Sequence, residues 1–165
     1  MNAAQGILAV YPGSFDPLHM GHVDIVRRAV RLFPKVLVAV LENTEKKPLF
    51  PTPERVELIR QTFAELPQVA VTSFSGLLVD FMRATGARVV LRGMRVVSDF
   101  EYEFQMALMN RRLCPEVETV FLTPQEEYTY LSSRLIKEIW ALGGNVRGLV
   151  PPPVLAALES LRKAS

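Results

Sequence analysis

The chain has 165 residues, of which 49% are hydrophobic, and its 19 basic and 17 acidic side chains give a net charge of +2. A chain of this length buries about 70% of the surface that it exposes when unfolded, so one domain spanning 1–165 is expected. The balanced charge argues against a protein that grips long nucleic acids, and no apolar run approaches the ~18 residues of a membrane span. The single cysteine, Cys114, excludes an intrachain disulfide framework and fits a reducing compartment. We therefore expect a cytoplasmic protein that binds neither nucleic acid nor membranes.

The first elements predicted are a short apolar strand at 7–11, a tight loop, and a helix that begins near Gly21. The sequence YPGSFDPLHMGH at 11–22 spans the loop. A helix N-terminus directs unpaired N–H groups and the positive end of its dipole toward the preceding loop, which suits a phosphate. His19 and His22 lie one helical turn apart at this end, so both can offer an imidazole donor to the same anion.

Two other interpretations of this histidine pair stay open. The pair could ligate zinc, although that metal needs three or four side-chain ligands and no nearby third ligand is evident. The imidazoles could instead be structural caps of the helix. The chain contains neither a Walker A sequence nor GxGxxG, so the prediction of a phosphate site does not depend on those motifs.

The rest of the chain alternates between strands and helices. Strands are predicted at 35–41, 69–72, 88–92 and 117–122, and helices at 52–66, 77–84 and 98–113. This alternation predicts an α/β fold, a single-domain, doubly wound, parallel five-stranded sheet of the Rossmann-like dinucleotide-binding type. A further helix at 131–140 begins near a serine pair, and a last helix at about 151–163 is expected to pack on the rim of the domain.

The helix predicted at 98–113 carries two apolar stripes on opposite sides. One stripe contains Phe100, Phe104, Ala107 and Leu108, and the other contains Tyr102, Met106, Met109 and Leu113. One stripe can face the core, and the other must be covered by the last helix or by another subunit, because large exposed apolar patches are uncommon on monomers. This pattern predicts a homo-oligomer.

Candidate chemistry gathers in the segments that follow the strands. In an open parallel sheet, ligands bind outside the carboxyl ends of the strands. The residues found there are Ser14, His19 and His22, then Lys46 and Lys47, then Arg92, Gly93 and Arg95, and finally Tyr128 to Arg134. Cations beside a helix N-terminus, with no evident acid–base dyad, favour a reaction helped by charge stabilisation. Lys47 and Arg134 are equally well explained as solvated surface residues.

These segments resemble the bacterial phosphopantetheine adenylyltransferase family of the HxGH nucleotidylyltransferase superfamily over essentially the full length. The similar stretches are YPGSFDPLHMGH at 11–22, KKPLF at 46–50, LRGMRVVSDFEYEFQMALMNRRL at 91–113 and EEYTYLSSRLIKEI at 126–139. HxGH alone indicates the superfamily. The RGMR, DFEYEFQMA and NRRL blocks point to this family rather than to enzymes acting on nicotinamide mononucleotide or glycerol phosphate.

The resemblance implies transfer of AMP from ATP to 4'-phosphopantetheine, giving dephospho-CoA and pyrophosphate in coenzyme A biosynthesis. It implies Mg²⁺ as cofactor, bound through the ATP phosphates and not by side chains. It further implies a homohexamer and CoA as a product-like inhibitor. Another phosphate acceptor, or a catalytically silent nucleotide-binding protein, remains as an alternative.

Residue roles follow from the same resemblance. The implied catalytic residues are His22, Lys46, Ser14 and Arg95, with His22 stabilising the pentavalent transition state and Ser14 binding the phosphoryl groups of both substrates. The implied phosphopantetheine residues are Ser14, Lys46, Leu78 and Arg92. The implied ATP residues are Ser14, Phe15, His22, Gly93, Met94, Arg95, Glu103, Tyr128, Thr129, Tyr130, Leu131, Ser132, Ser133 and Arg134.

This sequence differs from the usual family pattern at three of these positions. Ser14 stands where threonine is common, and its hydroxyl is less restricted in rotamer. Tyr128 replaces a frequent tryptophan. Arg134 stands where a third serine is frequent, and it can either reach a phosphate or point to solvent.

Overall fold

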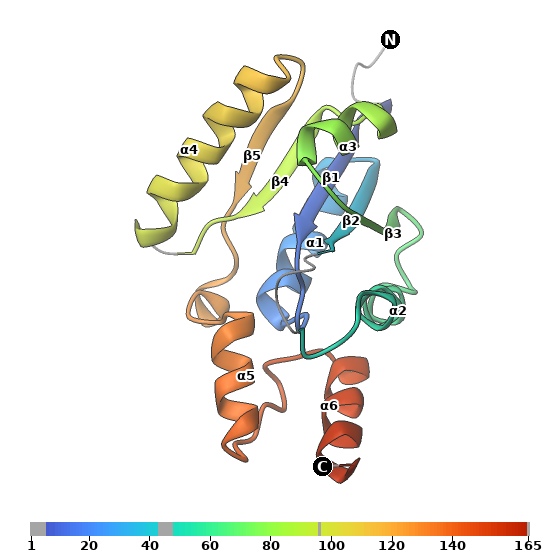
Figure 1. Ribbon diagram of the computed structural model, residues 1–165, viewed down its shortest axis with the longest axis vertical. Helices are drawn as coiled ribbons and strands as arrows, with labels where there is room; N and C mark the ends of the chain where they lie inside the picture. The colour runs from blue at the N-terminus through green and yellow to red at the C-terminus, as the bar shows by residue number, and fades with distance from the viewer. Residues whose placement is uncertain (1–5, 43–47, 96, 165) are drawn as a thin grey trace.

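Five parallel strands form one sheet in the order β3-β2-β1-β4-β5 (Figure 1). The computed structural model describes residues 6–42, 48–95 and 97–164. The strands are β1 (Leu8–Gly13), β2 (Lys35–Leu41), β3 (Val69–Phe74), β4 (Val89–Gly93) and β5 (Glu118–Leu122). The predicted parallel, doubly wound, five-stranded α/β domain is confirmed, whereas its extent over 1–165 stays a prediction.

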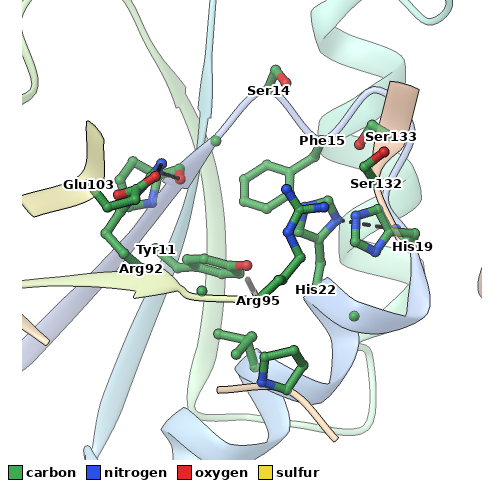
Figure 2. Close-up of a pocket in the computed structure, with 16 residues that line it drawn as sticks. Tyr11, Ser14, Phe15, His19, His22, Arg92, Arg95, Glu103, Ser132 and Ser133 are labelled. Carbon is green, nitrogen blue, oxygen red and sulfur yellow. Dashed lines mark hydrogen bonds and ion pairs between the residues drawn. The ribbon is translucent and has the colours of Figure 1, made fainter. Parts of the chain in front are cut away.

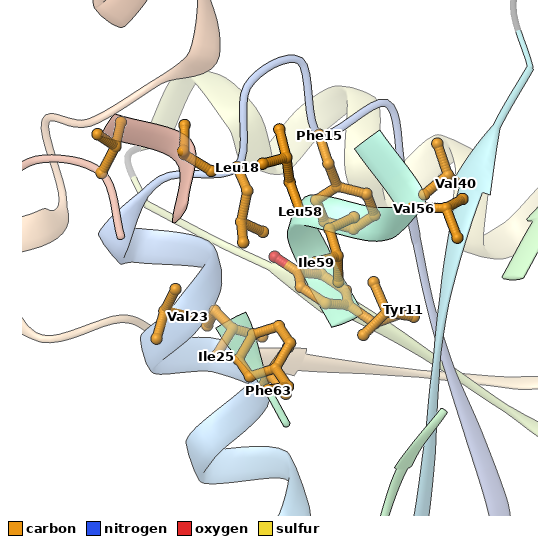
Figure 3. Packing of buried hydrophobic residues seen from close by; sticks show 14 of the residues in the cluster. Tyr11, Phe15, Leu18, Val23, Ile25, Val40, Val56, Leu58, Ile59 and Phe63 are labelled. Carbon is orange, nitrogen blue, oxygen red and sulfur yellow. The ribbon is translucent and has the colours of Figure 1, made fainter. Parts of the chain in front are cut away.

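Alternate residues of the inner strands enter two separate cores. Val36, Val38 and Val40 of β2 belong to one apolar cluster, and the intervening Ala39 belongs to the other. Successive side chains of a strand point to opposite faces, so a sheet buried on both sides needs a continuous apolar run. The first cluster includes side chains of α1 (Met20–Leu32) and α2 (Thr52–Thr62), and the second includes side chains of α3 (Leu78–Thr85). Figure 3 shows the first cluster around Tyr11, Phe15 and Ile59.

The structure extends β1 beyond the predicted end at Tyr11, through Pro12 to Gly13. Pro12 has no N–H to donate to a neighbouring strand, which is why proline is rare inside central strands. Here β4 pairs with β1 only at Ala9 and Val10, so Pro12 lies past that ladder. Helix α2 is shorter than the predicted 52–66, because Leu66 N donates to Phe63 O and the chain turns there.

The last elements lie beyond the carboxyl ends of the strands. They are the 3₁₀ helix η2 (Glu126–Tyr128), α5 (Ser133–Ala141) and α6 (Pro152–Ala164), and Figure 1 shows α5 and α6 below the sheet. Helix α6 contacts α2 and buries Val154 and Leu158 in the first cluster. No helix among the described residues is both long and apolar enough to cross a membrane.

Helix α4 (Val97–Leu113) contacts β5 and α3 but does not bury either apolar stripe. Its inward positions are Glu103, Ala107 and Asn110, while Phe100, Phe104, Met106 and Met109 are exposed. The prediction that one stripe faces the core is therefore wrong. The cause is an ion pair, because buried Glu103 pairs with Arg92 of β4 and this contact sets the rotation of the helix about its axis. Helix α6 packs against α2 and lies at the other end of the molecule from α4 (Figure 1), so both stripes stay exposed in the single chain.

Candidate functional site

A cavity of about 270 Å³ opens at the carboxyl ends of β1 and β4. From β1, strands β2 and β3 continue to one side of the sheet, and β4 and β5 lie on the other side. Ligands of doubly wound sheets bind at the point where the strand order reverses in this way. The wall is formed by residues 11–15, His19, Gly21, His22, Ile25, Arg92, Gly93, Arg95, Glu103, Pro124, Ser132 and Ser133. Figure 2 shows side chains from β1, α1, β4, α4 and the start of α5 converging there.

The loop after β1 turns sharply at Phe15, which has a positive φ of 47°. A bulky residue rarely adopts this conformation. Its buried ring lies edge-on to Tyr11 and to His22, with centroid separations of 5.3 Å and 5.0 Å. Burial also raises the pKa of Tyr11, so that phenol is a neutral part of the wall. The strained turn leaves Ser14 exposed at the mouth of the cavity.

The two histidine rings stack against each other at the N-terminus of α1, with centroids 3.6 Å apart. Gly21 permits this, because a Cβ there would lie 3.0 Å from Cε1 of His19. His22 Nδ1 accepts a hydrogen bond from the backbone N–H of His19 at 3.2 Å. The neutral ring of His22 therefore carries its proton on Nε2, where it can donate to a ligand.

Both imidazoles are neutral at pH 7. Burial, followed by the charge of Arg95, lowers the pKa of His19 to about 3. Burial, His19 and the nearby arginines hold the pKa of His22 well below its usual range. His19 Nδ1 has no hydrogen-bond partner among the described residues. Such a buried polar atom on a cavity wall is costly without a ligand.

Arg92 and Glu103 form a two-bond ion pair on the wall. Arg92 Nε donates to Glu103 Oε2 at 2.7 Å, Nη2 donates to Oε1 at 2.5 Å, and Nη1 donates to Pro12 O at 3.0 Å. Burial alone lowers the pKa of Arg92, but the hydrogen bond and charge of Glu103 outweigh it and raise that pKa. Glu103, which the resemblance implies contacts ATP, thus also fixes the orientation of the Arg92 guanidinium.

The start of α5 lines the first cavity through Ser132 and Ser133. Ser132 is the N-cap, and its hydroxyl accepts from Leu135 N at 3.1 Å, as the serine pair predicted. The Ser133 hydroxyl donates to Pro17 O at 2.8 Å and ties the helix to the first loop. Arg95 donates to Leu131 O, just before the cap. The backbone N–H groups at this helix end and the Arg95 side chain lie on one wall of the cavity, an arrangement that suits an anion.

The remaining predicted ATP residues do not line this cavity. Met94 N donates to Leu122 O, Thr129 donates to Glu126 O, and Leu131 is fully buried. Tyr130 is exposed, and Tyr128 lines a separate hollow beside α1 with Asp24 and Arg27. Arg134 points to solvent and pairs with Glu138 at 3.0 Å. Their contacts with ATP stay predictions, and Lys46 lies outside the described residues.

A second cavity of about 320 Å³ adjoins the first and shares Pro12, Gly13, Arg92 and Glu103 with it. The rest of its wall is mainly apolar and comprises Leu41, Phe74, Gly76, Leu77, Leu78, Tyr102, Met106, Ala107, Asn110 and Thr119. Leu78 lines this cavity, and its predicted contact with phosphopantetheine stays a prediction. Sequence reasoning missed the other members, although Leu41 and Phe74 could have been found as the last residues of β2 and β3.

The described residues contain no group of three or more His, Cys, Asp or Glu able to hold a metal ion. The carboxylate on the first cavity's wall, Glu103, is already paired with Arg92. Binding of Mg²⁺ through the ATP phosphates stays a prediction.

A cavity at the switch point of a doubly wound sheet, lined by an HxGH helix and by a second helix N-terminus, is typical of the nucleotidylyltransferase class. The family model described as cytidylyltransferase-like matches residues 10–139. Phosphopantetheine adenylyltransferases from Heliobacterium modesticaldum and Thioalkalivibrio sulfidiphilus are each 58% identical to the chain, covering 92% and 93% of it and 90% and 97% of those proteins. The chain belongs to the phosphopantetheine adenylyltransferase family of nucleotidyltransferases.

A solved structure shares the fold at much lower identity. A bifunctional NMN adenylyltransferase/ADP ribose pyrophosphatase from Francisella tularensis superposes with a TM-score of 0.74 over 95% of this chain, at 14% identity. This chain covers 50% of that protein. The likeness confirms the fold and carries no information on the acceptor.

Proposed function

We propose that this chain transfers the adenylyl group of ATP to 4'-phosphopantetheine, giving dephospho-CoA and pyrophosphate in coenzyme A biosynthesis. The observation that carries the proposal is the junction of two unlike cavities at Arg92. One is lined by imidazoles, an arginine and a helix N-terminus, and the other is mainly apolar. Such a pair suits a polyphosphate beside a long, uncharged arm that ends in a phosphate. The names of relatives 51–58% identical to the chain support it.

The reaction needs no general base. An anionic phosphate oxygen of the acceptor attacks the α-phosphorus of ATP, the new O–P bond forms, and the bond from that phosphorus to the bridging β-phosphate oxygen breaks. Pyrophosphate leaves with the electron pair. Catalysis then consists of aligning the two phosphates and stabilising the charge that spreads over the α-phosphoryl oxygens.

His22 supplies the stabilising donor in this scheme. Its Nδ1 is occupied by the His19 backbone N–H, so Nε2–H faces the ligand side as a fixed donor. Ser14 offers a hydroxyl at the mouth, and Arg95 adds a cation beside the histidines. The N–H groups of α5 around Ser132 and Ser133 receive the β- and γ-phosphates.

The acceptor lies in the second cavity with its phosphate toward Arg92. Leu78, Phe74 and Met106 offer apolar contact for the pantetheine arm, and Asn110 offers an amide to its peptide-like groups. Lys46 completes the phosphate site from the loop after β2. Mg²⁺ enters with the ATP phosphates and neutralises part of their charge.

Two further properties belong to this proposal. The exposed apolar residues of α4 support a homo-oligomer, a hexamer by family resemblance, in which other copies cover both stripes. CoA, which shares the pantetheine arm and the adenylyl group of the product, acts as a competing ligand of both cavities. We place the reaction in the cytoplasm, consistent with a single buried, unpaired cysteine.

The direct test is product identification. Purified protein is incubated with ATP, Mg²⁺ and phosphopantetheine, and dephospho-CoA is sought by mass spectrometry while pyrophosphate is quantified. Equal amounts of both products are expected. Hydrolysis of ATP to AMP and pyrophosphate without dephospho-CoA would contradict the acceptor, and no turnover at all would favour a silent nucleotide-binding protein.

A further inference from the structure

Two buried, oppositely charged side chains hold the Ser14 loop from outside the cavities. Arg55 of α2 is 4% exposed and Asp16 is 6% exposed, and neither lines either cavity. Arg55 Nη1 donates to Ser14 O at 2.6 Å, Nε donates to Phe50 O at 3.0 Å, and Nη2 donates to Thr52 Oγ1 at 2.7 Å. The planar guanidinium thus joins α2, the segment before it and the first loop in one geometry.

Asp16 fixes the same loop from its other end. Its Oδ1 accepts from Phe50 N at 2.9 Å, and its Oδ2 accepts from Leu49 N at 2.9 Å and from Lys137 Nζ of α5 at 3.2 Å. Arg55 and Asp16 therefore meet at Phe50, one at its carbonyl and the other at its N–H. Phe50 itself is fully buried, so this attachment point is rigid.

The residue between the two anchored positions is the strained one. Phe15, with a φ of 47°, follows Ser14 and precedes Asp16. A bulky residue persists in such a conformation only when its surroundings enforce it. Here the Ser14 carbonyl and the Asp16 carboxylate are both held, and the Phe15 ring is packed against His22 at a centroid distance of 5.0 Å.

A buried ion pair adds little net stability to a fold, since well-packed apolar residues of similar size often stabilise it equally well. The desolvation is real at this position, because burial lowers the pKa of Arg55 while Asp16 and Glu42 counteract it. What the charged pair provides is a defined direction for the backbone of residues 14–16. That backbone carries the Ser14 hydroxyl at the mouth of the first cavity.

We propose that Arg55 and Asp16 are positioning residues for adenylyl transfer, which act through Ser14 by holding the strained turn at Phe15. The inference rests on the proposed function, since it assigns Ser14 to the phosphoryl groups of both substrates. Neither residue touches substrate.

The test is a double-mutant cycle between Arg55→Lys and Ser14→Ala. Lysine keeps the charge but cannot reach Ser14 O and Phe50 O with one planar group. A displaced hydroxyl is expected to lower kcat about 10- to 100-fold while the dissociation constant for ATP, measured by calorimetry, changes less than about 3-fold. In the Ser14→Ala background the same substitution is expected to have less than about a 2-fold further effect.

Thr52→Val is the matched control, because it removes the Arg55 bond that does not reach the loop. Its kcat is expected to stay within about 2-fold of the unsubstituted chain. Asp16→Asn, which weakens the other anchor, is expected to reproduce the kcat loss of Arg55→Lys. All variants are assayed at 25 °C after thermal unfolding has shown that they are folded.

Independent, multiplying effects of Arg55→Lys and Ser14→Ala on kcat would overturn the inference. So would a failure of both Arg55→Lys and Asp16→Asn to fold, since the pair would then serve stability alone. The unsubstituted chain separates this inference from the function. If it releases no pyrophosphate with phosphopantetheine, the proposed function fails; if it is active and the effects multiply, only the positioning role fails.

Discussion

The two adjoining cavities differ in what surrounds their shared wall. The first is lined by His19, His22, Arg95 and the start of α5, and the second by Leu78, Phe74 and other apolar side chains. Arg92 belongs to both. One sheet edge thus carries two unlike surfaces, with imidazoles, Arg95 and a helix N-terminus on the α1 and α5 side and mainly apolar side chains on the α3 and α4 side.

The contrast also separates rate from affinity. In the proposed reaction, groups in the first cavity act on charge that changes during the transfer, so their loss should lower kcat. In the same proposal, groups in the second cavity contact a part of the acceptor that does not react, so their loss should raise KM for the acceptor. Substitutions in the two cavities should therefore have different kinetic signatures.

The largest effect is expected for His22→Ala. Removal of a fixed donor to the transition state should lower kcat by about 10²–10³-fold with the fold intact. Steady-state pyrophosphate release and circular dichroism measure both quantities. His22→Gln keeps a donor of similar reach and should recover part of the rate. A variant that lost acceptor and ATP affinity with an unchanged kcat would contradict the assignment.

Arg92, which lines both cavities, should affect both catalysis and stability when substituted. Arg92→Lys keeps one charge but loses the planar fork, so kcat/KM for phosphopantetheine is expected to fall about 10- to 100-fold. Because Glu103 then loses its two-bond partner, thermal stability should also fall. Arg92→Lys combined with Glu103→Gln should regain stability without regaining rate. Recovery of both together would reduce Arg92 to a structural role.

A substitution in the apolar cavity should affect the acceptor alone. Leu78→Ala removes contact with the pantetheine arm and is expected to raise KM for phosphopantetheine about 5- to 10-fold, with KM for ATP and kcat little changed. Leu142→Ala, at a position 89% exposed, is the matched control. An equal rise in both KM values would remove the distinction between the cavities.

The smallest effect is expected in the pH dependence of the free energy of unfolding. The pKa of His19 is lowered to about 3, so between pH 6.5 and 3 the unfolded chain binds a proton that the folded chain does not. The free energy of unfolding should therefore fall as the pH falls through that window, by up to about 1.4 kcal/mol per pH unit for this histidine.

Urea titrations at pH 6 and pH 5, where most carboxylates are still ionised, measure this slope. His19→Asn should make it shallower, and a slope unchanged by the substitution would show that His19 is already protonated in the folded chain.

The parallel sheet was predictable because its signal is local and redundant. The run Val36–Val40 is apolar without a break, which a strand needs only when both of its faces are buried. The rule that ligands bind beyond the strand ends then predicted that Ser14, His22, Arg92 and Arg95 lie close together, and all four line one cavity. The capped helix start at Ser132 was equally local.

Other features depend on partners that are distant in sequence. Both sides of α4 are apolar, so its pattern could not show that Glu103 and Asn110 point inward, and the ion pair of Glu103 with Arg92 on β4 became visible only in the structure. The roles of Arg55 and Asp16 depend likewise on the Leu49–Phe50 backbone. Such pairings arise from tertiary geometry, which hydrophobic periodicity does not encode.

The most direct measurement is pyrophosphate release from ATP and Mg²⁺ with phosphopantetheine, compared with nicotinamide mononucleotide and with glycerol phosphate. We expect release with phosphopantetheine alone, because the other acceptors have no arm to occupy the apolar cavity around Leu78. Equal release with nicotinamide mononucleotide or glycerol phosphate would contradict it.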